Sequence, residues 1–181
     1  KGTSKRFADP TADEISKNDL AQDPKERAEN IMITDLVRND LSHTAQKAAV
    51  EVKELCGIYS ILQVHQMIST ITSKMDPKYT AVDALKTTFP MGSMTGAPKF
   101  AAMKIIEELE ETKRGLYSGA VGYFSPNGDF DFNVVIRSIL YNEENQYVSF
   151  SVGSAITSLS VPEKEYEECL LKAKAMHEVL Q

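Results

Sequence analysis

The sequence predicts a mixed α/β (α+β) fold, a layered sandwich of mostly antiparallel sheets flanked by amphipathic helices. Three observations support this prediction: stretches rich in Ile, Val, Thr and Tyr, segments with apolar residues at helical spacing, and an Asn-Gly pair between two strand-like runs. At 181 residues the chain has the size of one domain or a large fragment of one. Neither an internal repeat nor a linker divides it.

The first part of the chain predicts one helix followed by two strands. Residues 1–23 are polar and lack sustained periodicity, which predicts a strand end that passes into a mobile loop with little core. From Pro24 apolar residues recur at helical spacing, with Asp23 placed as the N-cap. Residues 48–55 alternate between apolar and charged side chains, and residues 58–73 are rich in β-branched ones. Both ranges are predicted to be strands.

The second part predicts three helices and three strands. Residues 80–89 have a short helical pattern that ends before a proline, and residues 98–111 form an amphipathic helix. The predicted strands are residues 117–125, 129–141 and 146–152. Asn127 and Gly128 are expected to take the positive φ angles of a tight turn between the first two of these strands. A last helix is expected over residues 162–179.

Composition excludes several classes of protein. Hydrophobic residues make up 42% and charged residues 25%, which excludes a disordered or collagen-like chain. No window approaches the roughly 18 consecutive apolar residues of a membrane span, so no membrane association is expected. The formal net charge of −6 leaves no broad basic surface for phosphate backbones, so nucleic acid is not an expected partner. The first residue is not Met, and we expect the sequence to be the interior of a longer protein.

Cysteines and histidines supply no predicted metal site. Cys56 and Cys169 are far apart and outside any CxxC pattern, so they are expected to be buried, inert thiols in a reducing cytoplasm. The three histidines have neither HxxxH nor HExxH spacing.

Two predicted helices could each offer a pair of carboxylates. Glu26 and Glu29 are three residues apart on the first helix. Glu165, Glu168 and Lys172 share one face of the last helix. Mg²⁺ takes oxygen ligands and usually binds a few carboxylates together with an anionic group of the substrate. Spacing alone favours ordinary solvated helix faces over a metal site.

A loop with two glycines precedes the helix at residues 98–111. Residues 92–99 read Gly-Ser-Met-Thr-Gly-Ala-Pro-Lys, and the free N–H groups at a helix start attract anions. The glycine spacing does not match a Walker loop, so nucleotide binding is not supported. A carboxylate or small-anion site and an ordinary capped helix entry remain equal alternatives.

Arg137 is predicted to lie inside a strand among apolar neighbours, where an arginine is costly unless it is paired. It is either the internal partner of an acid, which the sequence alone favours, or a two-pronged clamp for a substrate carboxylate. Tyr117 is expected to open the preceding strand and to share that face, although packing alone explains a tyrosine in a strand.

Five motifs, in one order, resemble the chorismate-utilising enzymes, a family that includes anthranilate synthase, aminodeoxychorismate synthase, isochorismate synthase and salicylate synthase. The segments that resemble family motifs are the helix at residues 25–41, the FPxGSxTGAPK loop at 89–99, RRGxYxGxxGY at 114–123, the IR(T/S) strand at Arg137 and PxxEYEE at 162–168. Because accidents of spacing do not recur five times in order, the resemblance favours the functional interpretations of these residues over the structural ones. It implies an anthranilate-synthase-like fold, with residues 1–181 as its C-terminal part.

The resemblance implies a magnesium site and a substrate pocket. Glu29 and Glu165, with Glu26 and Glu168 beside them, would hold the Mg²⁺ that binds the ring carboxylate of chorismate. Arg137 and Tyr117 would hold the enolpyruvyl carboxylate. The implied substrate contacts are Thr3, Thr95, Tyr117, Arg137, Gly153 and Lys172.

The opening Lys1-Gly2-Thr3 resembles the P-I-K-G-T strand of many aminodeoxychorismate synthases, whereas anthranilate synthases usually have Ala in the lysine position. Lys1 would then be the nucleophile that expels the 4-hydroxyl before ammonia, supplied by a glutamine amidotransferase subunit or domain, enters at that carbon. Lys172 is the second implied catalytic residue. The product would be 4-amino-4-deoxychorismate, for para-aminobenzoate and folate biosynthesis. For Lys1 the alternative is a solvated lysine at the end of the chain. For the whole chain the alternatives are an anthranilate synthase component I or a non-catalytic chorismate-binding fragment.

The chain departs from the family pattern in three places. His-Leu-x-Ser is replaced by Gln66-Met67-Ile68-Ser69, Gly-Gly-Gly-Ile by Gly153-Ser154-Ala155-Ile156, and Asp-Ser by Leu159-Ser160. His65 is one place early and so is expected on the opposite strand face. The changes affect a contact near the leaving hydroxyl, the close backbone approach at Ala155 and one carboxylate.

Overall fold

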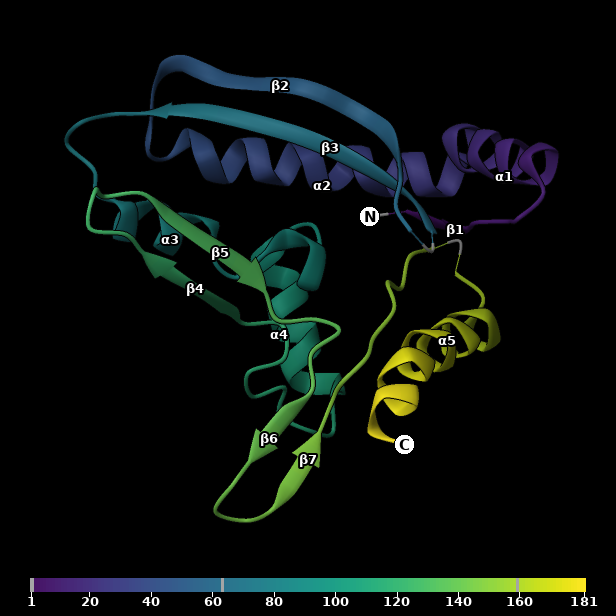
Figure 1. The fold of residues 1–181 in the computed structure, drawn as a ribbon. Helices are drawn as coiled ribbons and strands as arrows, with labels where there is room; N and C mark the ends of the chain where they lie inside the picture. The colour runs from purple at the N-terminus through teal and green to yellow at the C-terminus, as the bar shows by residue number, and fades with distance from the viewer. Residues whose placement is uncertain (1, 63, 159) are drawn as a thin grey trace. The chain divides into compact units, whose positions relative to one another are not determined.

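The structure, a computed structural model, describes residues 2–62, 64–158 and 160–181 (Figure 1). The chain divides into two compact units, Lys1–Leu109 and Glu110–Gln181. The first unit consists of β1 (Thr3–Lys5), α1 (Pro10–Gln22), α2 (Pro24–Ser42), β2 (Ala45–Ser60), β3 (Val64–Met75), α3 (Ala81–Thr88), the 3₁₀ helix η1 (Gly92–Met94) and α4 (Lys99–Leu109). The second consists of β4 (Ala120–Phe124), β5 (Phe130–Val134), β6 (Leu140–Asn142), β7 (Tyr147–Ser149) and α5 (Pro162–Leu180).

An antiparallel sheet forms the centre of the first unit. Its strand order is β1-β3-β2, with Thr3 opposite Gln66 and Gly57 opposite Ile68. Helix α2 packs against both β2 and β3 and runs along their length (Figure 1). The predicted mixed fold with antiparallel sheets and flanking helices is therefore confirmed.

Helix α2 begins where the sequence predicts. The Asp23 side chain accepts a hydrogen bond of 2.9 Å from the N–H of Glu26, and Pro24 occupies the first helical position. The cap and the proline together fix the residue at which the helix starts, and so place Glu26 in its first turn.

Helix α1 corrects the prediction for residues 1–23. The strand end exists as β1, but a 13-residue helix takes the place of the expected loop. Asp9 caps it by accepting from the N–H of Ala12 at 2.9 Å. Leu20 is only 4% exposed and belongs to the core cluster, so this segment contributes core that the sequence did not predict.

The small core of the first unit joins α1 to the sheet. Leu20 packs with Cys56 of β2 and Met67 of β3, and Ile58 lies against them. Met67 has no exposed surface, and Cys56 is buried as predicted, while Cys169 in the second unit is half-buried.

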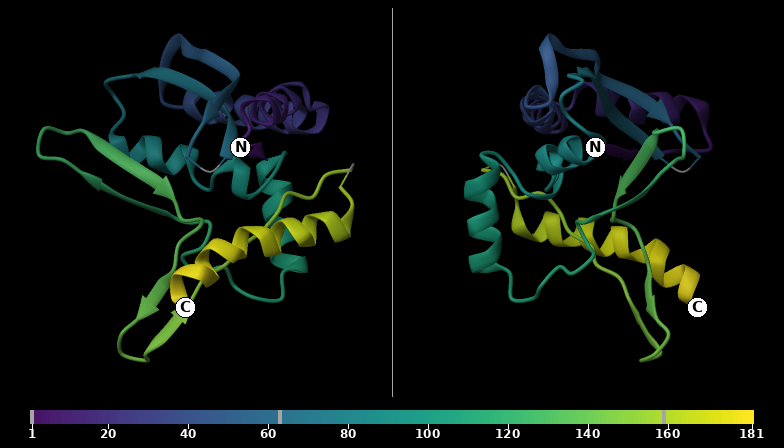
Figure 2. Two further views of the ribbon diagram at one scale, coloured as in Figure 1. Left: turned by 45° about the vertical axis from the view of Figure 1, so that its right-hand side comes forward. Right: turned by 90° about the vertical axis from the view of Figure 1, so that its left-hand side faces the viewer.

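Two hairpins make up the strands of the second unit. β4 pairs with β5 and β6 with β7, both antiparallel, and the hairpins extend in different directions (Figure 2). The turn between β4 and β5 differs from the prediction because only Gly128 has a positive φ, of 90°. The N–H of Gly128 donates to Ser125 at 2.9 Å, and the N–H of Ser125 donates to the carbonyl of Asp129 at 2.7 Å. The loop is thus longer than a two-residue Asn-Gly turn.

The predicted strand at residues 129–141 is two strands. β5 ends at Val134 and β6 begins at Leu140, and Arg137 lies between them with a φ of 52°. A left-handed residue breaks a strand because its N–H and C=O no longer point toward the neighbouring strand. The N–H of Ile136 donates instead to the carbonyl of Val134 at 2.9 Å.

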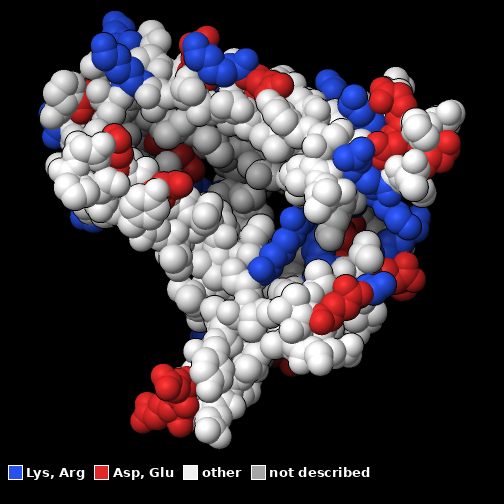
Figure 3. Space-filling model, viewed as in Figure 1, with Lys and Arg blue, Asp and Glu red and all other residues white. Residues whose placement is uncertain are grey.

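Charges of both signs occur on the face of the molecule that Figure 3 shows. Figure 3 shows lysine and arginine side chains interspersed with acidic ones over the visible face. The acidic group at the tip of the β6–β7 hairpin corresponds to Glu143 and Glu144, which lie between those strands. Within the described ranges, no helix combines the length and apolar composition that crossing a bilayer requires.

Candidate active site

Glu26 and Glu29 lie near the start of α2, and both side chains are half-buried. The end of β1 approaches this turn closely at Gly2, which is buried. A Cβ atom on Gly2 would lie 2.6 Å from Glu26 Oε2 and 3.3 Å from a Leu20 methyl. A side chain at this position would have to displace the Glu26 carboxylate. The second residue of the Lys-Gly-Thr motif therefore packs directly against a predicted metal ligand.

Asn30, beside Glu29, connects α2 to the sheet. Its side-chain oxygen accepts a hydrogen bond from the Ser69 hydroxyl and a weaker one of 3.6 Å from the Cys56 thiol. Its amide nitrogen donates to the carbonyl of Met67 at 3.4 Å. Cys56 is 26 positions from Asn30 in the sequence, and Ser69 is 39 positions from it. Residue spacing along one element could therefore not reveal these contacts.

The glycine loop is fixed against the second half of α2. A Cβ atom on the buried Gly92 would lie 2.8 Å from a Leu36 methyl, so the loop backbone touches the helix. Lys99 forms an ion pair with Asp40 at 2.6 Å. The Thr95 hydroxyl donates to the carbonyl of Met91 at 3.1 Å and is half-buried. The loop that contains Thr95 therefore contacts the helix that carries Glu26.

Helix α5 carries Glu165, Glu168 and Lys172 on one face, as the sequence predicts. Glu165 is 5% exposed, and the Ser154 hydroxyl lies 2.5 Å from its Oε2 atom. The same hydroxyl lies 2.8 Å from Oε2 of Glu168. Lys172 contacts the other oxygen of Glu168 at 2.8 Å and donates to the carbonyl of Gly153 at 3.0 Å. Glu165, Glu168 and Lys172 therefore do meet on one side of the helix, and Ser154, which the sequence analysis did not identify as a site residue, joins them.

Tyr117 completes this cluster. A Cβ atom on Gly153 would lie 2.7 Å from the Tyr117 hydroxyl oxygen, so a side chain at position 153 would displace that hydroxyl. The sequence predicts that Tyr117 opens a strand, but in the structure it lies in a turn before β4. Burial raises the pKa of its hydroxyl, and the nearby Arg114 guanidinium acts in the opposite direction.

We call Tyr117, Gly153, Ser154, Glu165, Glu168 and Lys172 the α5 cluster. Five of its six members are residues that the sequence analysis placed in the site. All six belong to the second unit, whereas Glu26, Glu29, Thr3 and Thr95 belong to the first. Lys1 lies outside the described residues.

Arg137 corrects one interpretation. It lies in the bend between β5 and β6, and its side chain is exposed. Among the described residues no acid forms an ion pair with it, so the favoured reading of a buried acid partner within a strand is wrong. A role as a clamp for a substrate carboxylate stays a prediction.

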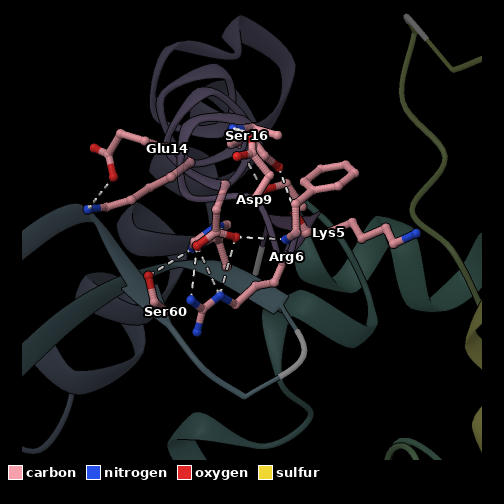
Figure 4. Close-up of polar contacts among 12 residues, drawn as sticks. Lys5, Arg6, Asp9, Glu14, Ser16 and Ser60 are labelled. Carbon is pink, nitrogen blue, oxygen red and sulfur yellow. Dashed lines mark hydrogen bonds and ion pairs between the residues drawn. The ribbon is translucent and has the colours of Figure 1, made fainter.

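His65 has a structural explanation. It is 1% exposed; its Nε2 lies 3.1 Å from Asp13 and its Nδ1 lies 2.8 Å from the Ser60 hydroxyl. Arg6 pairs with Asp13 at 2.9 Å, and Figure 4 shows Arg6 and Ser60 pointing into this network. The guanidinium and the N–H of Phe7 hold the pKa of Asp13 well below its usual range. The network ties β1 and α1 to the β2–β3 hairpin.

An apolar pocket of about 310 Å³ lies elsewhere in the second unit. Its lining includes Leu116, Val121, Val135 and Leu140, and none of the predicted site residues contributes to it. A substrate with two carboxylates needs cationic or metal partners, so this pocket does not suit it.

Each unit carries a pair of glutamates that could serve as oxygen ligands of a metal ion. Among the described residues, no group of three or more His, Cys, Asp and Glu side chains is placed to hold a metal ion. Glu165 and Glu168 supply two oxygen donors within reach of one hydroxyl, and α2 carries a second pair. Carboxylates of this kind are what Mg²⁺ takes from a protein, because it keeps its remaining positions for water and substrate.

Comparison with known proteins agrees with the motifs. The family model described as chorismate binding enzyme matches residues 1–178. The chain is 45% identical over 175 residues to the chloroplastic aminodeoxychorismate synthase of Arabidopsis thaliana, covering 97% of the chain and 19% of that protein. It is 41% identical over 180 residues to aminodeoxychorismate synthase component 1 of Bacillus subtilis and to anthranilate synthase component 1 of Aquifex aeolicus. These two matches cover 99% of the chain and 38% and 36% of the relatives.

Solved structures share the fold. Anthranilate synthase component I from Streptococcus pneumoniae matches 96% of the chain with a TM-score of 0.77 and 34% identity, and the chain covers 39% of it. The menaquinone-specific isochorismate synthase MenF from Escherichia coli matches 99% of the chain with a TM-score of 0.85, and the chain covers 40% of it. Its 24% identity supports likeness of fold alone. The chain spans well under half of each of these proteins.

Proposed function

The chain belongs to the family of chorismate binding enzymes, and from that premise we propose that it is the C-terminal part of an aminodeoxychorismate synthase component I. Such an enzyme replaces the 4-hydroxyl of chorismate with an amino group and so makes 4-amino-4-deoxychorismate. The observation that carries the proposal is the α5 cluster, in which a tyrosine hydroxyl and a lysine lie against Gly153 and two carboxylates lie against the Ser154 hydroxyl.

The proposed metal ligands are Glu26 and Glu29 on α2 and Glu165 and Glu168 on α5. Bound there, Mg²⁺ supplies positive charge that neutralises the ring carboxylate of chorismate and stabilises the negative charge that develops as the ring double bonds shift. The position of Glu165 supports this role, because one of its oxygens and one of Glu168 face the same Ser154 hydroxyl.

The proposed substrate contacts act on the enolpyruvyl carboxylate. Tyr117 would donate a hydrogen bond from its hydroxyl, which its raised pKa keeps protonated at neutral pH. Arg137 is exposed, so its planar guanidinium is accessible to a carboxylate that can accept two parallel hydrogen bonds. Lys172 lies beside Gly153 and would face the same pocket.

Lys1 is the proposed nucleophile. Its amine would form a bond to the ring as the bond to the 4-hydroxyl breaks and the hydroxyl leaves. Ammonia would then form a bond to the ring carbon that carried the hydroxyl as the bond between Lys1 and the ring breaks, which releases the product and the free lysine. The amine must be neutral to attack, so burial or a neighbouring cation would have to lower its pKa. The close packing of Gly2 against Glu26 supports this placement, because it fixes the residue next to Lys1 beside a proposed metal ligand.

The ammonia would come from a glutamine amidotransferase subunit or domain, and the expected compartment is the cytoplasm. A second candidate function is that of an anthranilate synthase component I. The 41% identity to the Aquifex aeolicus protein and the 34% identity to the Streptococcus pneumoniae structure favour it as the alternative. The lysine before Gly2 favours the aminodeoxychorismate synthase.

The test uses the full-length protein, because the chain spans only part of its relatives. The protein is incubated with chorismate, ammonia and Mg²⁺, and the product is identified by chromatography. We expect 4-amino-4-deoxychorismate, and no turnover when EDTA replaces Mg²⁺. Formation of anthranilate would select the second candidate, and turnover in EDTA would reject the metal.

A further inference from the structure

We propose that Ser154 is a positioning residue that holds the Glu165 and Glu168 carboxylates together for a divalent cation. The inference rests on the proposed function, because it takes these two glutamates as metal ligands. Ser154 itself has no part in the proposed chemistry.

The geometry of the hydroxyl supports this role. Ser154 Oγ lies 2.5 Å from Oε2 of Glu165 and 2.8 Å from Oε2 of Glu168. A hydroxyl has one proton, so it donates to one carboxylate at a time, and both carboxylates turn one oxygen toward the same point. Like charges three residues apart on a helix repel each other. The shared hydroxyl offsets that repulsion and brings two oxygens to one place.

Glu168 is held at both of its oxygens. Oε2 faces Ser154, and Oε1 forms the ion pair of 2.8 Å with Lys172. A carboxylate with contacts at both oxygens has a defined orientation although its side chain is 46% exposed. Without the serine, Glu168 would keep only its contact to Lys172, on the side away from Glu165.

The backbone beneath Ser154 is itself anchored. Lys172 donates to the carbonyl of Gly153 at 3.0 Å, and the Tyr117 hydroxyl packs against the Cα of Gly153. The residue before Ser154 is therefore held in place by contacts with Lys172 and Tyr117. Ligands that are already oriented lose less freedom when the ion binds, and so bind it more tightly.

The experiment compares Mg²⁺ binding by full-length variants in isothermal titration calorimetry, without substrate. Loss of a group that orients metal ligands typically weakens affinity about 10- to 100-fold, so we expect Ser154→Ala to bind Mg²⁺ roughly tenfold more weakly. Ser154→Thr keeps the hydroxyl and should restore most of the affinity. Ser160→Ala is the matched control, because the Ser160 hydroxyl accepts from the N–H of Thr157 in the same loop and, within the described part of the chain, forms no hydrogen bond with Glu165 or Glu168.

The outcomes separate this inference from the proposed function. A parent protein that binds no Mg²⁺ overturns the metal site and this inference with it. A parent that binds Mg²⁺ while Ser154→Ala binds equally well overturns only the role of Ser154. Equal weakening in Ser154→Ala and Ser160→Ala also overturns it, because it would indicate general damage to the loop. Melting temperatures measured without Mg²⁺ identify a variant that is simply unfolded.

Discussion

The Lys99 ammonium lies 2.6 Å from a carboxylate oxygen of Asp40, and both side chains are largely buried. This ion pair joins the first residue of α4 to the last turn of α2. Together with the contact between Gly92 and Leu36, it fixes the glycine loop to the helix that carries Glu26. A proposed substrate contact, Thr95, and the proposed metal ligands of α2 therefore lie on two segments that contact each other.

Lys99→Met should destabilise the protein, because it leaves the buried Asp40 carboxylate without its cation. Asp40 is 6% exposed, and breaking such a pair costs about 3 kcal/mol. Urea unfolding measures the change. The control is Arg38→Met, which breaks the exposed pair with Asp35 and should change stability by less than about 1 kcal/mol. Equal effects of the two substitutions would contradict a buried pair.

Gly153→Ala should raise the KM for chorismate, because it displaces the proposed substrate contact Tyr117. The added methyl group would lie 2.7 Å from the Tyr117 hydroxyl and would push it from its place. The double variant Gly153→Ala/Tyr117→Phe also removes the hydroxyl that clashes with the added methyl group. Its change in KM should therefore be smaller than the sum of the changes in the two single variants. Strict additivity in steady-state kinetics would show that the two residues do not interact.

Glu165→Gln should weaken Mg²⁺ binding and turnover together. A neutral amide is a poorer ligand for a hard cation and leaves the substrate carboxylate without compensation. Calorimetry and the dependence of the rate on Mg²⁺ concentration measure the two effects. Glu167→Gln, at an exposed position of the same helix, is the control and should behave as the parent. An unchanged magnesium dependence in Glu165→Gln would reject the metal assignment.

The sequence predicts α5 but not α1, and in both cases the reason is whether side chains at helical spacing form a recognisable pattern. On a helix, side chains three, four and seven residues apart share a face, so the meeting of Glu165, Glu168 and Lys172 follows from spacing. Helix α1 has one buried residue, Leu20, so no periodic apolar pattern marks it. Its stability comes from the Asp9 cap and from contacts with distant strands.

The loop residues were the least predictable. Ser154 reaches glutamates that are 11 and 14 positions away, across a loop whose path the sequence does not define. Arg137 has apolar neighbours that predict a strand, but its left-handed backbone lies in the bend between β5 and β6. Propensity describes a residue in an average environment, whereas tertiary contacts decide where a strand stops.

Acid should destabilise the first unit through Asp13. Because Arg6 lowers the pKa of Asp13 in the folded state, the folded protein favours the ionised form more than the unfolded chain does. The resulting stability is fully present above the unfolded pKa of about 3.9 and is lost as the pH falls through the lower folded pKa. Urea unfolding of the parent and Asp13→Asn should therefore differ most near pH 7 and converge in strong acid. Asp19→Asn, at an exposed position of α1, is the control, and a difference that is independent of pH would contradict the argument.

Lys1→Ala tests the choice between the two synthases. If Lys1 is the nucleophile, the full-length parent should form a covalent adduct derived from chorismate, and the variant should form none and should aminate the ring far more slowly. The proposed metal ligands lie on α2 and α5, so the variant should still bind Mg²⁺ and chorismate, which separates chemistry from binding. Intact-protein mass spectrometry detects the adduct, and calorimetry measures the binding. Lys5→Ala is the control, because Lys5 is an exposed lysine of β1, and it should keep both adduct and turnover. A Lys1→Ala variant that makes 4-amino-4-deoxychorismate at the parental rate would reject covalent catalysis by this residue.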